Sequence, residues 1–449
     1  MGRLFGTDGV RGIANRDLSV ELATQIGSAL AMVLREDCDH KPRVMVGKDT
    51  RASSDMIEAA LIAGLCSGGA DAVLLGVVPT PMVAYLVTSQ NTDAGVMISA
   101  SHNPFEFNGI KVFGSGGIKL CDQKEEEIEA IILDHSIPFA FAPPHDIGTV
   151  STLVGGLEQY TDHLAATVSA DLRGLRVLVD CSNGSASSTA SLLFKKLGCS
   201  ATIINARPNG TNVNQSCGST HVELLSEMVV SGGYQLAVAF DGDADRCLAV
   251  DEKGAVINGD QLIAIFATEL KRQGRLRGNT AVVTVMSNYG FFRFAKENGI
   301  DTRATKVGDR YVLETMLRDG FAIGGEQSGH IIFTDYMTTG DGQLSAVQLL
   351  AALATSGKTL SELCSIITVM PQVLLNVSAT RDMKASMHES VELNQQLRDC
   401  ENRLEGRGRV LLRPSGTEPL IRVMVEGDNL DELNEIAGTL AKAIEKYLK

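Results

Sequence analysis

Residues 236–246 read Leu-Ala-Val-Ala-Phe-Asp-Gly-Asp-Ala-Asp-Arg, an apolar run that passes directly into alternating carboxylates. A short, unbroken apolar run of this kind is typical of a buried strand in a parallel sheet. Asp241, Asp243 and Asp245 then lie on a loop at the carboxyl end of that strand, and we expect Gly242 to let the backbone curl so that they converge. Hard oxygen ligands suit Mg²⁺, and clustered carboxylates repel one another unless a cation neutralises them. The stretch therefore predicts an α/β fold with a Mg²⁺ site.

Two other acidic motifs share this spacing. A calcium loop of the EF-hand type would place Glu252 at its twelfth position, but Arg246 stands at the sixth, where glycine is required. Strands instead of helices also flank the loop, so this interpretation is rejected. A phosphatase that forms an aspartyl phosphate places an Asp-x-Asp motif after a strand, with the first aspartate as nucleophile. Asp241 therefore stays open as an alternative nucleophile.

Apolar runs alternate with helical patterns on both sides of this loop, which is typical of parallel sheets covered by helices. Strands are expected at 43–47, 72–76, 95–98 and 281–285, and helices at 54–67, 186–197 and 260–273. Near the C-terminus two strands adjoin in sequence, which favours an antiparallel α+β layer. We predict three mixed-sheet α/β domains and a smaller α+β domain, at residues 1–150, 151–255, 256–368 and 369–449.

The composition restricts the partners and the compartment. The 449 residues include 40 Lys plus Arg against 54 Asp plus Glu, a net charge of −14 that repels nucleic acid and anionic membranes. The nine cysteines are scattered without a CxxC pair, so their spacing indicates no zinc site, and free thiols in a reducing cytosol are expected. The N-terminal residues lack the apolar core of a signal peptide, and no apolar run has the length of a membrane span. We expect a cytoplasmic protein whose phosphorylated ligands are met by local clusters of cations.

A second motif follows the predicted strand at 95–98. Residues 99–104 read Ser-Ala-Ser-His-Asn-Pro, which places Ser101 on a loop where α/β sheets usually bind ligands. A serine nucleophile needs a base or a polarised phosphoryl donor beside it, and His102 could orient it. Taken alone, the hexapeptide is equally well explained as a plain turn.

Two glycine-bearing loops offer contacts for a sugar phosphate. In 324–330, glycines allow close approach, and Glu326 and Ser328 can bond to sugar hydroxyls. In 413–419, hydroxyls, a backbone N–H freed by glycine and arginine forks form a phosphate cradle, which Arg422 extends. Each could instead be an ordinary turn.

Several cations could gather around Ser101 and supply the positive field that the net charge does not. Each of them taken alone is typical of a protein surface. They are Arg11 in the glycine-rich segment 5–12, Lys48 and Arg51 after the strand at 43–47, and Lys111 after the Ser101 loop, with Lys306, Asp309 and Arg310 as a further group.

These motifs, in this order along the chain, resemble those of the α-D-phosphohexomutase family. The resemblance rests on FGTDGVRG at 5–12, the Ser101 loop, the 241–245 carboxylates, GEQSGH at 325–330 and RPSGTEP at 413–419. It implies four domains around a central cleft, each contributing one loop. The residues at 105–107, Phe-Glu-Phe, depart from the more polar pattern expected there, which concerns loop packing more than chemistry.

The resemblance also implies a role for each matching residue. Ser101 is the phosphoserine, and Asp241, Asp243 and Asp245 hold Mg²⁺ together with the phosphate on Ser101. Lys111 acts as general acid and base, with His102, Arg246 and His330 also in the catalytic group. The substrate is bound by Arg11, Lys48, Arg51, Glu326 and Ser328, and its distal phosphate by Arg413, Ser415, Gly416, Thr417 and Arg422.

The implied reaction interconverts glucosamine 6-phosphate and glucosamine 1-phosphate through a bisphosphate, on the route to UDP-N-acetylglucosamine and peptidoglycan precursors. Glucose 1,6-bisphosphate or glucosamine 1,6-bisphosphate would prime the enzyme. The sequence leaves the oligomeric state open, with a homodimer as one candidate. Mannose and glucose phosphates as substrates, a phosphatase that uses Asp241, and a non-catalytic sugar-phosphate sensor are the alternatives.

Overall fold

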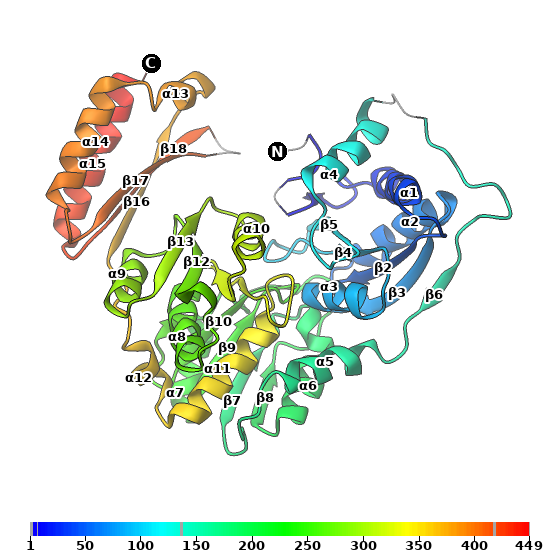
Figure 1. Cartoon of the computed structure of the whole chain (residues 1–449), viewed down its shortest axis with the longest axis horizontal. Helices are drawn as coiled ribbons and strands as arrows, with labels where there is room; N and C mark the ends of the chain where they lie inside the picture. Colours follow the sequence, from blue (N-terminus) through cyan, green and yellow to red (C-terminus); the bar gives the residue numbers. More distant parts are fainter. Residues whose placement is uncertain (1–2, 7, 135–137, 416–418, 449) are drawn as a thin grey trace. The chain divides into compact units, whose positions relative to one another are not determined.

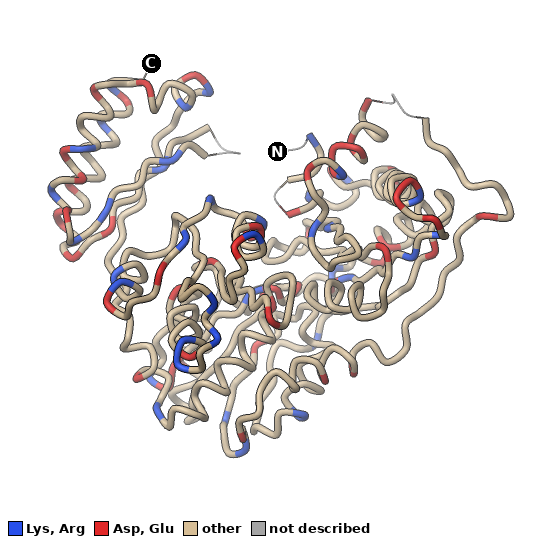
Figure 2. Tube along the Cα trace, in the orientation of Figure 1, with Lys and Arg blue, Asp and Glu red and all other residues tan. Residues whose placement is uncertain are grey.

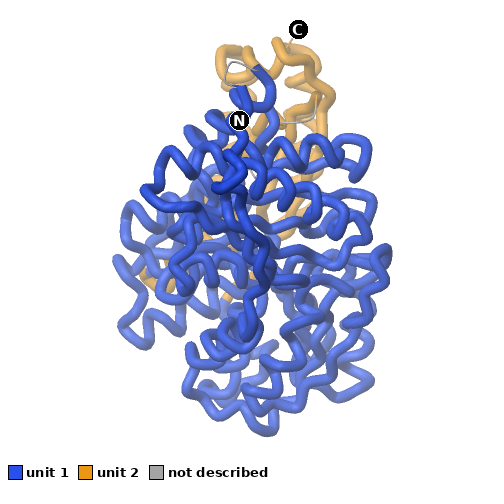
Figure 3. The backbone as a smooth tube through the Cα atoms, turned by 90° about the vertical axis from the view of Figure 1, so that its right-hand side faces the viewer, with its two compact units in different colours: residues 1–286, 300–366 blue, residues 287–299, 367–449 orange. Residues whose placement is uncertain are grey.

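The computed structural model describes residues 3–6, 8–134, 138–415 and 419–448. The chain divides into two compact units, one formed by residues 1–286 and 300–366 and the other by 287–299 and 367–449 (Figure 3). Each unit is described by itself, and the predicted central cleft stays a prediction because it would involve both.

The first sheet of the larger unit has the strand order β1-β5-β4-β2-β3-β6 (Figure 1). The inner strands and β6 are parallel, whereas β5 returns antiparallel to β4 and β1 pairs antiparallel with β5. The strands are β1 (Val10–Ile13), β2 (Arg43–Lys48), β3 (Asp71–Val77), β4 (Ala94–Ile98), β5 (Phe107–Gly114) and β6 (Val150–Thr152), and the helices are α1 (Val20–Asp37), α2 (Ser54–Ser67), α3 (Thr80–Ser89) and α4 (Asp122–Glu129).

The second sheet of this unit has the order β11-β10-β9-β7-β8, and the stretch at 236–240 is its central strand β9. β7 lies parallel to β8 and β9, whereas β10 pairs antiparallel with both β9 and β11. The strands are β7 (Arg176–Asp180), β8 (Ser200–Ile204), β9 (Leu236–Phe240), β10 (Cys247–Asp251) and β11 (Val256–Ile257), and the helices are α5 (Gly156–Ala166), α6 (Ala190–Leu197) and α7 (Glu223–Gly232).

The helix expected at 186–197 begins differently. Residues 185–188 form a 3₁₀ turn, and α6 starts only at Ala190. Ser188 Oγ donates to the carbonyl of Ser185 at 2.8 Å, and Thr189 Oγ1 donates back to Ala186. Such local side-chain hydrogen bonds compete with regular helix, which explains the delayed start.

The third sheet has the order β13-β12-β14-β15, in which β12 is parallel to β13 and β14, and β15 is antiparallel to β14. Its strands are β12 (Thr280–Thr284), β13 (Asp301–Thr305), β14 (Ile323–Gly325) and β15 (Ile331–Phe333), and its helices are α8 (Gly259–Arg272), α10 (Asp309–Asp319), α11 (Gly342–Ser356) and α12 (Leu360–Cys364). The three sheets confirm the predicted α/β class with mixed strand directions.

The smaller unit is an antiparallel sheet, β16-β18-β17, covered by helices. Figure 1 shows α14 and α15 side by side, and Figure 2 shows charges of both signs along them, as expected for helices with one solvated face. The elements are β16 (Gln372–Ser378), β17 (Arg409–Pro414), β18 (Leu420–Glu426), α13 (Arg381–Ser386), α14 (Val391–Arg403), α15 (Leu430–Tyr447) and, from the earlier segment, α9 (Tyr289–Glu297). This confirms the α+β layer.

Candidate functional site

Ser101 lies on the loop that follows β4 and is almost completely buried. Its Oγ donates a hydrogen bond to Asp241 Oδ2 at 2.5 Å, and His102 Nδ1 lies 3.4 Å from the same oxygen. The backbone at Ser101 has φ 53°, a left-handed conformation that is uncommon for residues other than glycine. Such a conformation persists only where the surroundings hold it, so the loop must be firmly positioned.

Arg51 positions this loop by contacting its backbone carbonyl groups. Its guanidinium is fully buried and pairs with Asp49 at 2.7 Å. Every remaining N–H of the guanidinium donates to a backbone carbonyl of the loop, namely those of Ser101, Asn103, Pro104 and Phe107. No donor is left for a substrate phosphate. The expected substrate-binding role of Arg51 is therefore corrected to a positioning role, because its charge is used within the protein.

The three carboxylates after β9 converge as the sequence predicts. Asp241, Asp243 and Asp245 are buried, and their ligand atoms lie within 4.8 Å of one another. Oδ1 of Asp243 and Oδ1 of Asp245 are buried and have no hydrogen-bond partner among the described residues. Burial and the two neighbouring carboxylates raise the pKa of Asp241 well above its ordinary value. Unpartnered carboxylate oxygens in a buried cluster fit a divalent cation.

Gly242 serves this loop in a different way from the one expected. The left-handed residue of the loop is Ala244, with φ 58°. A Cβ at Gly242 would lie 2.5 Å from the carbonyl oxygen of Ser101. Glycine is needed there because the two loops approach closely, not because the backbone curls at that residue.

Lys111 on β5 lies among these carboxylates and is buried. Its Nζ is 2.8 Å from Asp243 Oδ2, 3.4 Å from Asp245 Oδ2 and 3.0 Å from Asp8 Oδ2. Burial alone would lower the pKa of Lys111, but the carboxylates, Asp243 first, raise it well above its ordinary value. The ammonium group is therefore held in its charged form.

Thr80, at the start of α3, was not identified from sequence. Its Oγ1 donates to Asp243 Oδ2 at 2.6 Å and its N–H donates to the carbonyl of Asp243 at 2.9 Å. These bonds fix the orientation of the carboxylate. The Pro-Thr-Pro sequence at 79–81 marks a helix start but carries no sign of this contact.

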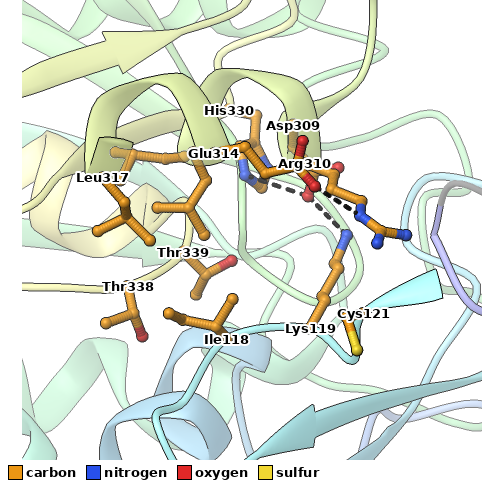
Figure 4. Close-up of a pocket in the computed structure, with 12 residues that line it drawn as sticks. Ile118, Lys119, Cys121, Asp309, Arg310, Glu314, Leu317, His330, Thr338 and Thr339 are labelled. Carbon is orange, nitrogen blue, oxygen red and sulfur yellow. Dashed lines mark hydrogen bonds and ion pairs between the residues drawn. The ribbon is translucent and has the colours of Figure 1, made fainter. Parts of the chain in front are cut away.

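His330 connects the carboxylates to α10. Its Nδ1 lies 3.6 Å from Asp245 Oδ2 and its Nε2 lies 3.6 Å from Asp309 Oδ2. Figure 4 shows Lys119 reaching the same Asp309 carboxylate beside a cavity of 210 Å³. The N–H of Gly340 donates to Nε2 of His330 at 3.1 Å, which in a neutral ring leaves the proton on Nδ1, facing Asp245.

Among the other expected cations, Arg11, Lys48 and Arg310 pair with carboxylates, whereas Lys306 Nζ lies 5.9 Å from the centre of the Tyr311 ring. Arg11 pairs with Asp8, and Lys48 pairs with Glu58 and with Asp55. Arg310 pairs with acids of α4 and with Glu314 on its own helix. Lys48 and Arg310 are therefore already compensated without any substrate.

Arg246 and His102 lie at the edge of the carboxylate cluster. Arg246 Nε is 3.9 Å from Asp245 Oδ1, and its backbone N–H donates to Asp241 Oδ1 at 3.2 Å. Burial, and then the charge of Arg246, lower the pKa of His102 to about 4. His102 is therefore neutral near pH 7, and its Nδ1 faces a serine hydroxyl whose proton is donated to Asp241.

In the 324–330 loop, Glu326 and Ser328 lie at partly exposed positions. Glu326 Oε1 accepts a hydrogen bond from the backbone N–H of Gly308 at 3.0 Å, which joins this loop to the 306–310 segment. The Oγ of Ser328 is buried and has no partner among the described residues. Both side chains retain unused acceptor or donor capacity for a sugar hydroxyl.

In the smaller unit, Arg413 on β17 and Arg422 on β18 are directly opposite each other. Burial, and then the charge of Arg422, lower the pKa of Arg413. Two guanidinium groups at opposed positions bring several N–H donors together, which fits a phosphate. Ser415 is buried next to them, whereas Gly416 and Thr417 lie outside the described residues.

Comparison with known sequences and structures defines the class. The sequence matches the phosphoglucomutase/phosphomannomutase family in all four of its domains: α/β/α domain I over residues 2–137, domain II over 158–254, domain III over 258–370 and the C-terminal domain over 374–443. The chain belongs to this family. The boundaries predicted from sequence stay a prediction.

Individual relatives are more specific. The phosphoglucosamine mutases of Acetivibrio thermocellus and Clostridium novyi are each 52% identical to the chain, over 100% and 99% of both sequences respectively. Among solved structures, a phosphoglucomutase/phosphomannomutase family protein of Burkholderia thailandensis has a TM-score of 0.83 at 24% identity, covering 99% of this chain and 98% of its own. Aspergillus fumigatus N-acetylphosphoglucosamine mutase, in complex with GlcNAc-6P and magnesium, has a TM-score of 0.70 at 18% identity, covering 99% and 96%. These structures share the fold.

Proposed function

We propose that the chain is a phosphoglucosamine mutase, which interconverts glucosamine 6-phosphate and glucosamine 1-phosphate through a phosphoserine and a bisphosphate intermediate. The observation that carries the proposal is the hydrogen bond from Ser101 Oγ to Asp241 within a buried carboxylate cluster. A phosphoryl carrier beside a cation site is what such a transfer needs. The full-length relatives with that name support the choice of the amino sugar.

In the first half-reaction, the phosphoryl group of phospho-Ser101 passes to the free hydroxyl of the sugar phosphate. The bond from phosphorus to Ser101 Oγ breaks, and a bond from phosphorus to the sugar oxygen forms. Lys111, charged among its carboxylates, protonates the serine oxygen and takes up the proton that the attacking sugar hydroxyl releases. When the other phosphate returns, it takes the proton of the serine hydroxyl and protonates the departing sugar oxygen. Neutral His102 lies beside the serine, with Nδ1 3.4 Å from Ser101 Oγ, and helps to position it.

Asp241, Asp243 and Asp245 would hold Mg²⁺, with an oxygen of the phosphate on Ser101 completing its ligands. The ion would stabilise negative charge on the transferring phosphoryl group. Arg246 and His330 border the same carboxylates and would add to that field. Glucose 1,6-bisphosphate or glucosamine 1,6-bisphosphate would reload a dephosphorylated serine.

Substrate binding is assigned to the remaining loops. Glu326 and Ser328 have free hydrogen-bonding capacity for sugar hydroxyls, and Arg11 borders the Lys111 cluster through Asp8. The opposed Arg413 and Arg422, with the neighbouring residues 415–417, would hold whichever phosphate is not reacting. The bisphosphate has to present each of its phosphates to Ser101 in turn, so a single distal cradle accounts for the turnaround.

The cysteines and helices bear on the compartment of the protein. None of the nine cysteines, all of which lie in the described ranges, is in a disulfide, in keeping with a cytoplasmic protein. No described helix combines the length and the apolar character needed to cross a lipid bilayer. We expect small-molecule partners only, and a homodimer stays a prediction.

The test is to map the phosphate and to compare substrates. The active enzyme should carry one phosphoserine in the peptide 99–104, and Ser101→Ala should remove it together with nearly all turnover. Ser115→Ala, at an exposed serine, is the matched control and should keep both. Phosphate on Asp241 together with normal turnover of Ser101→Ala would replace the mutase by a phosphatase. A higher kcat/KM for glucose or mannose 6-phosphate than for glucosamine 6-phosphate would overturn the choice of sugar.

A further inference from the structure

Three side chains with metal-ligating groups meet where β2 and β4 of the first sheet begin. The Ser101 loop lies at the opposite end of β4. Cys38 follows α1, His40 comes two residues later, and Asp93 directly precedes β4. The Ser101 loop leaves the other end of β4, so a strand of five residues, about 16 Å, separates the two places. The cluster is therefore independent of the phosphoryl-transfer site.

The donor atoms of this cluster are spaced as metal ligands are. Cys38 Sγ lies 3.5 Å from Asp93 Oδ1, His40 Nε2 lies 3.0 Å from the same oxygen, and all three atoms are within 4.8 Å of one another. Tetrahedral Zn²⁺ with ordinary Zn–S, Zn–N and Zn–O bonds separates its ligand atoms by about 3.3–3.6 Å. Small shifts of side chains on this partly exposed edge would bring the three atoms to that spacing.

The ligand atoms are oriented by further contacts. Asp93 Oδ2 accepts a hydrogen bond from the backbone N–H of Arg43 at 2.8 Å, which leaves Oδ1 to face Cys38 and His40. The second ring nitrogen of His40, Nδ1, lies 3.1 Å from Asp39 Oδ1. A histidine that binds a metal through one nitrogen and a carboxylate through the other is the usual arrangement at zinc sites. This second contact distinguishes the cluster from a chance hydrogen-bonded pair.

The charges around the cluster are mostly negative. The Cys38 thiol lies beside the Asp93 carboxylate, with Sγ 3.5 Å from Oδ1. Asp37 lies beside it and is paired with Lys124 at 3.0 Å, whereas Lys41 donates to the carbonyl of Ile147. A divalent cation bound by Cys38, His40 and Asp93 would compensate this negative charge.

We propose that Cys38, His40 and Asp93 bind one Zn²⁺ ion. An adjoining cavity of 600 Å³, lined by these three residues among others, gives water access to the fourth ligand position. The ion ties the connection between α1 and β2 to the connection between α3 and β4. It binds in addition to the Mg²⁺ proposed at Asp241, Asp243 and Asp245, because thiolate and imidazole ligands favour Zn²⁺ over Mg²⁺.

The test replaces Zn²⁺ by Co²⁺ in chelator-treated enzyme that has been saturated with Mg²⁺. Co²⁺ bound to a thiolate has a near-ultraviolet charge-transfer band, which the all-carboxylate site cannot produce. We expect the band, with one equivalent of metal, in the unmodified protein and in Asp243→Asn. It should be absent in Cys38→Ser and retained in Cys121→Ser, at an exposed cysteine elsewhere.

Zinc affinity, measured by competition with a chromophoric chelator, gives a second readout. Cys38→Ser and His40→Ala should weaken it by about 100-fold or more, and Asp39→Asn by about 10-fold. Mutase turnover of all three variants should match that of the unmodified enzyme, which excludes misfolding. No band in the unmodified protein, or an unchanged band in Cys38→Ser, would overturn the proposal.

Discussion

Lys111 and Arg51, two buried cations near Ser101, have different roles. Lys111 neutralises carboxylates, with three of them within 3.4 Å of its Nζ. Arg51 has a single carboxylate partner and uses its other donors to fix the backbone of the Ser101 loop. A lost Lys111 would leave uncompensated charge, whereas a lost Arg51 would release a strained loop.

Arg51→Lys should lower kcat while leaving metal binding nearly unchanged. Lysine keeps the charge beside Asp49, but its single nitrogen cannot span the carbonyls that the guanidinium reaches. A displaced Ser101 Oγ should lower kcat by about 100-fold. Steady-state kinetics and calorimetric Mg²⁺ titration measure the two effects. Arg173→Lys, at an exposed arginine, is the control, and normal kcat in Arg51→Lys would contradict the positioning role.

Asp341 makes stability depend on pH. Burial raises its pKa to about 7, although Leu344 N–H and Tyr160 OH both donate to the carboxylate. The folded state therefore binds a proton that the unfolded chain has released above pH 4, so stability falls as the pH rises from about 4 to 7. Asparagine keeps the N-cap of α11 and has no charge to bury.

Asp341→Asn should therefore gain stability relative to the unmodified protein as the pH rises. The difference in free energy of unfolding between the two should grow by on the order of 2–4 kcal/mol between pH 4 and 8. Apparent melting temperatures of both proteins across this range, in constant Mg²⁺, check it. Parallel curves would show that Asp341 is ionised throughout in the folded state.

At the scale of elements, the site is made where loops from two sheets meet. The loop after β4 carries Ser101, and the loop after β9 carries the three carboxylates. Both lie at the carboxyl ends of parallel strands, where α/β folds bind ligands. Their separation is set by backbone contact at Gly242, so the distance from serine to carboxylate depends on the absence of a side chain there.

Gly242→Ala should separate these loops and impair turnover. The added Cβ would meet the Ser101 carbonyl oxygen at 2.5 Å, and a backbone atom can relieve that contact only by moving the loop. We expect kcat to fall by about 100-fold with the circular dichroism spectrum retained. Gly438→Ala in α15 is the matched control, since a Cβ there has no neighbour within 4 Å, and it should be neutral or slightly stabilising.

At the scale of the whole molecule, the chain crosses between its two units three times, at 286/287, 299/300 and 366/367. The segment 287–299 therefore packs with a sheet that is built from residues more than seventy positions later. Buried Glu426 on β18 joins them: it accepts from Asn288 Nδ2 at 3.1 Å, from the Tyr289 N–H at 3.2 Å and from Arg409 Nε at 2.6 Å.

Glu426→Ala should loosen α9 from the smaller unit. The substitution leaves buried donors without an acceptor and Arg409 without its carboxylate, which costs about 1–3 kcal/mol. Hydrogen exchange of peptides from 287–299 should accelerate, whereas peptides from β2 and β4 should be unaffected. Glu405→Ala, at an exposed glutamate, should change neither. If peptides from 287–299 exchanged at the same rate in Glu426→Ala and Glu405→Ala, apolar packing alone would hold α9 in place.

The sequence by itself determined the helices and strands and the carboxylate cluster, whose three residues lie on one loop. Strand β9 and helix α2 lie where their patterns predict, because hydrophobic periodicity and capping are local properties of the chain. The convergence of Asp241, Asp243 and Asp245 followed for the same reason, since three residues on one short loop cannot lie far apart.

Only the tertiary structure decided which residues from distant segments meet. The contacts of Asp8, Thr80 and Asp309 with this site depend on strand order and on the packing of separate sheets, which no spacing in the sequence encodes. Arg51 illustrates the same point. Its charge suggested that it would bind a phosphate, whereas its buried guanidinium donates to backbone carbonyls of the Ser101 loop. Cys38 and Asp93 are likewise far apart in the chain and meet because β2 pairs with β4. Strand pairing is a long-range choice, set by the burial of whole sheets and not by any local pattern.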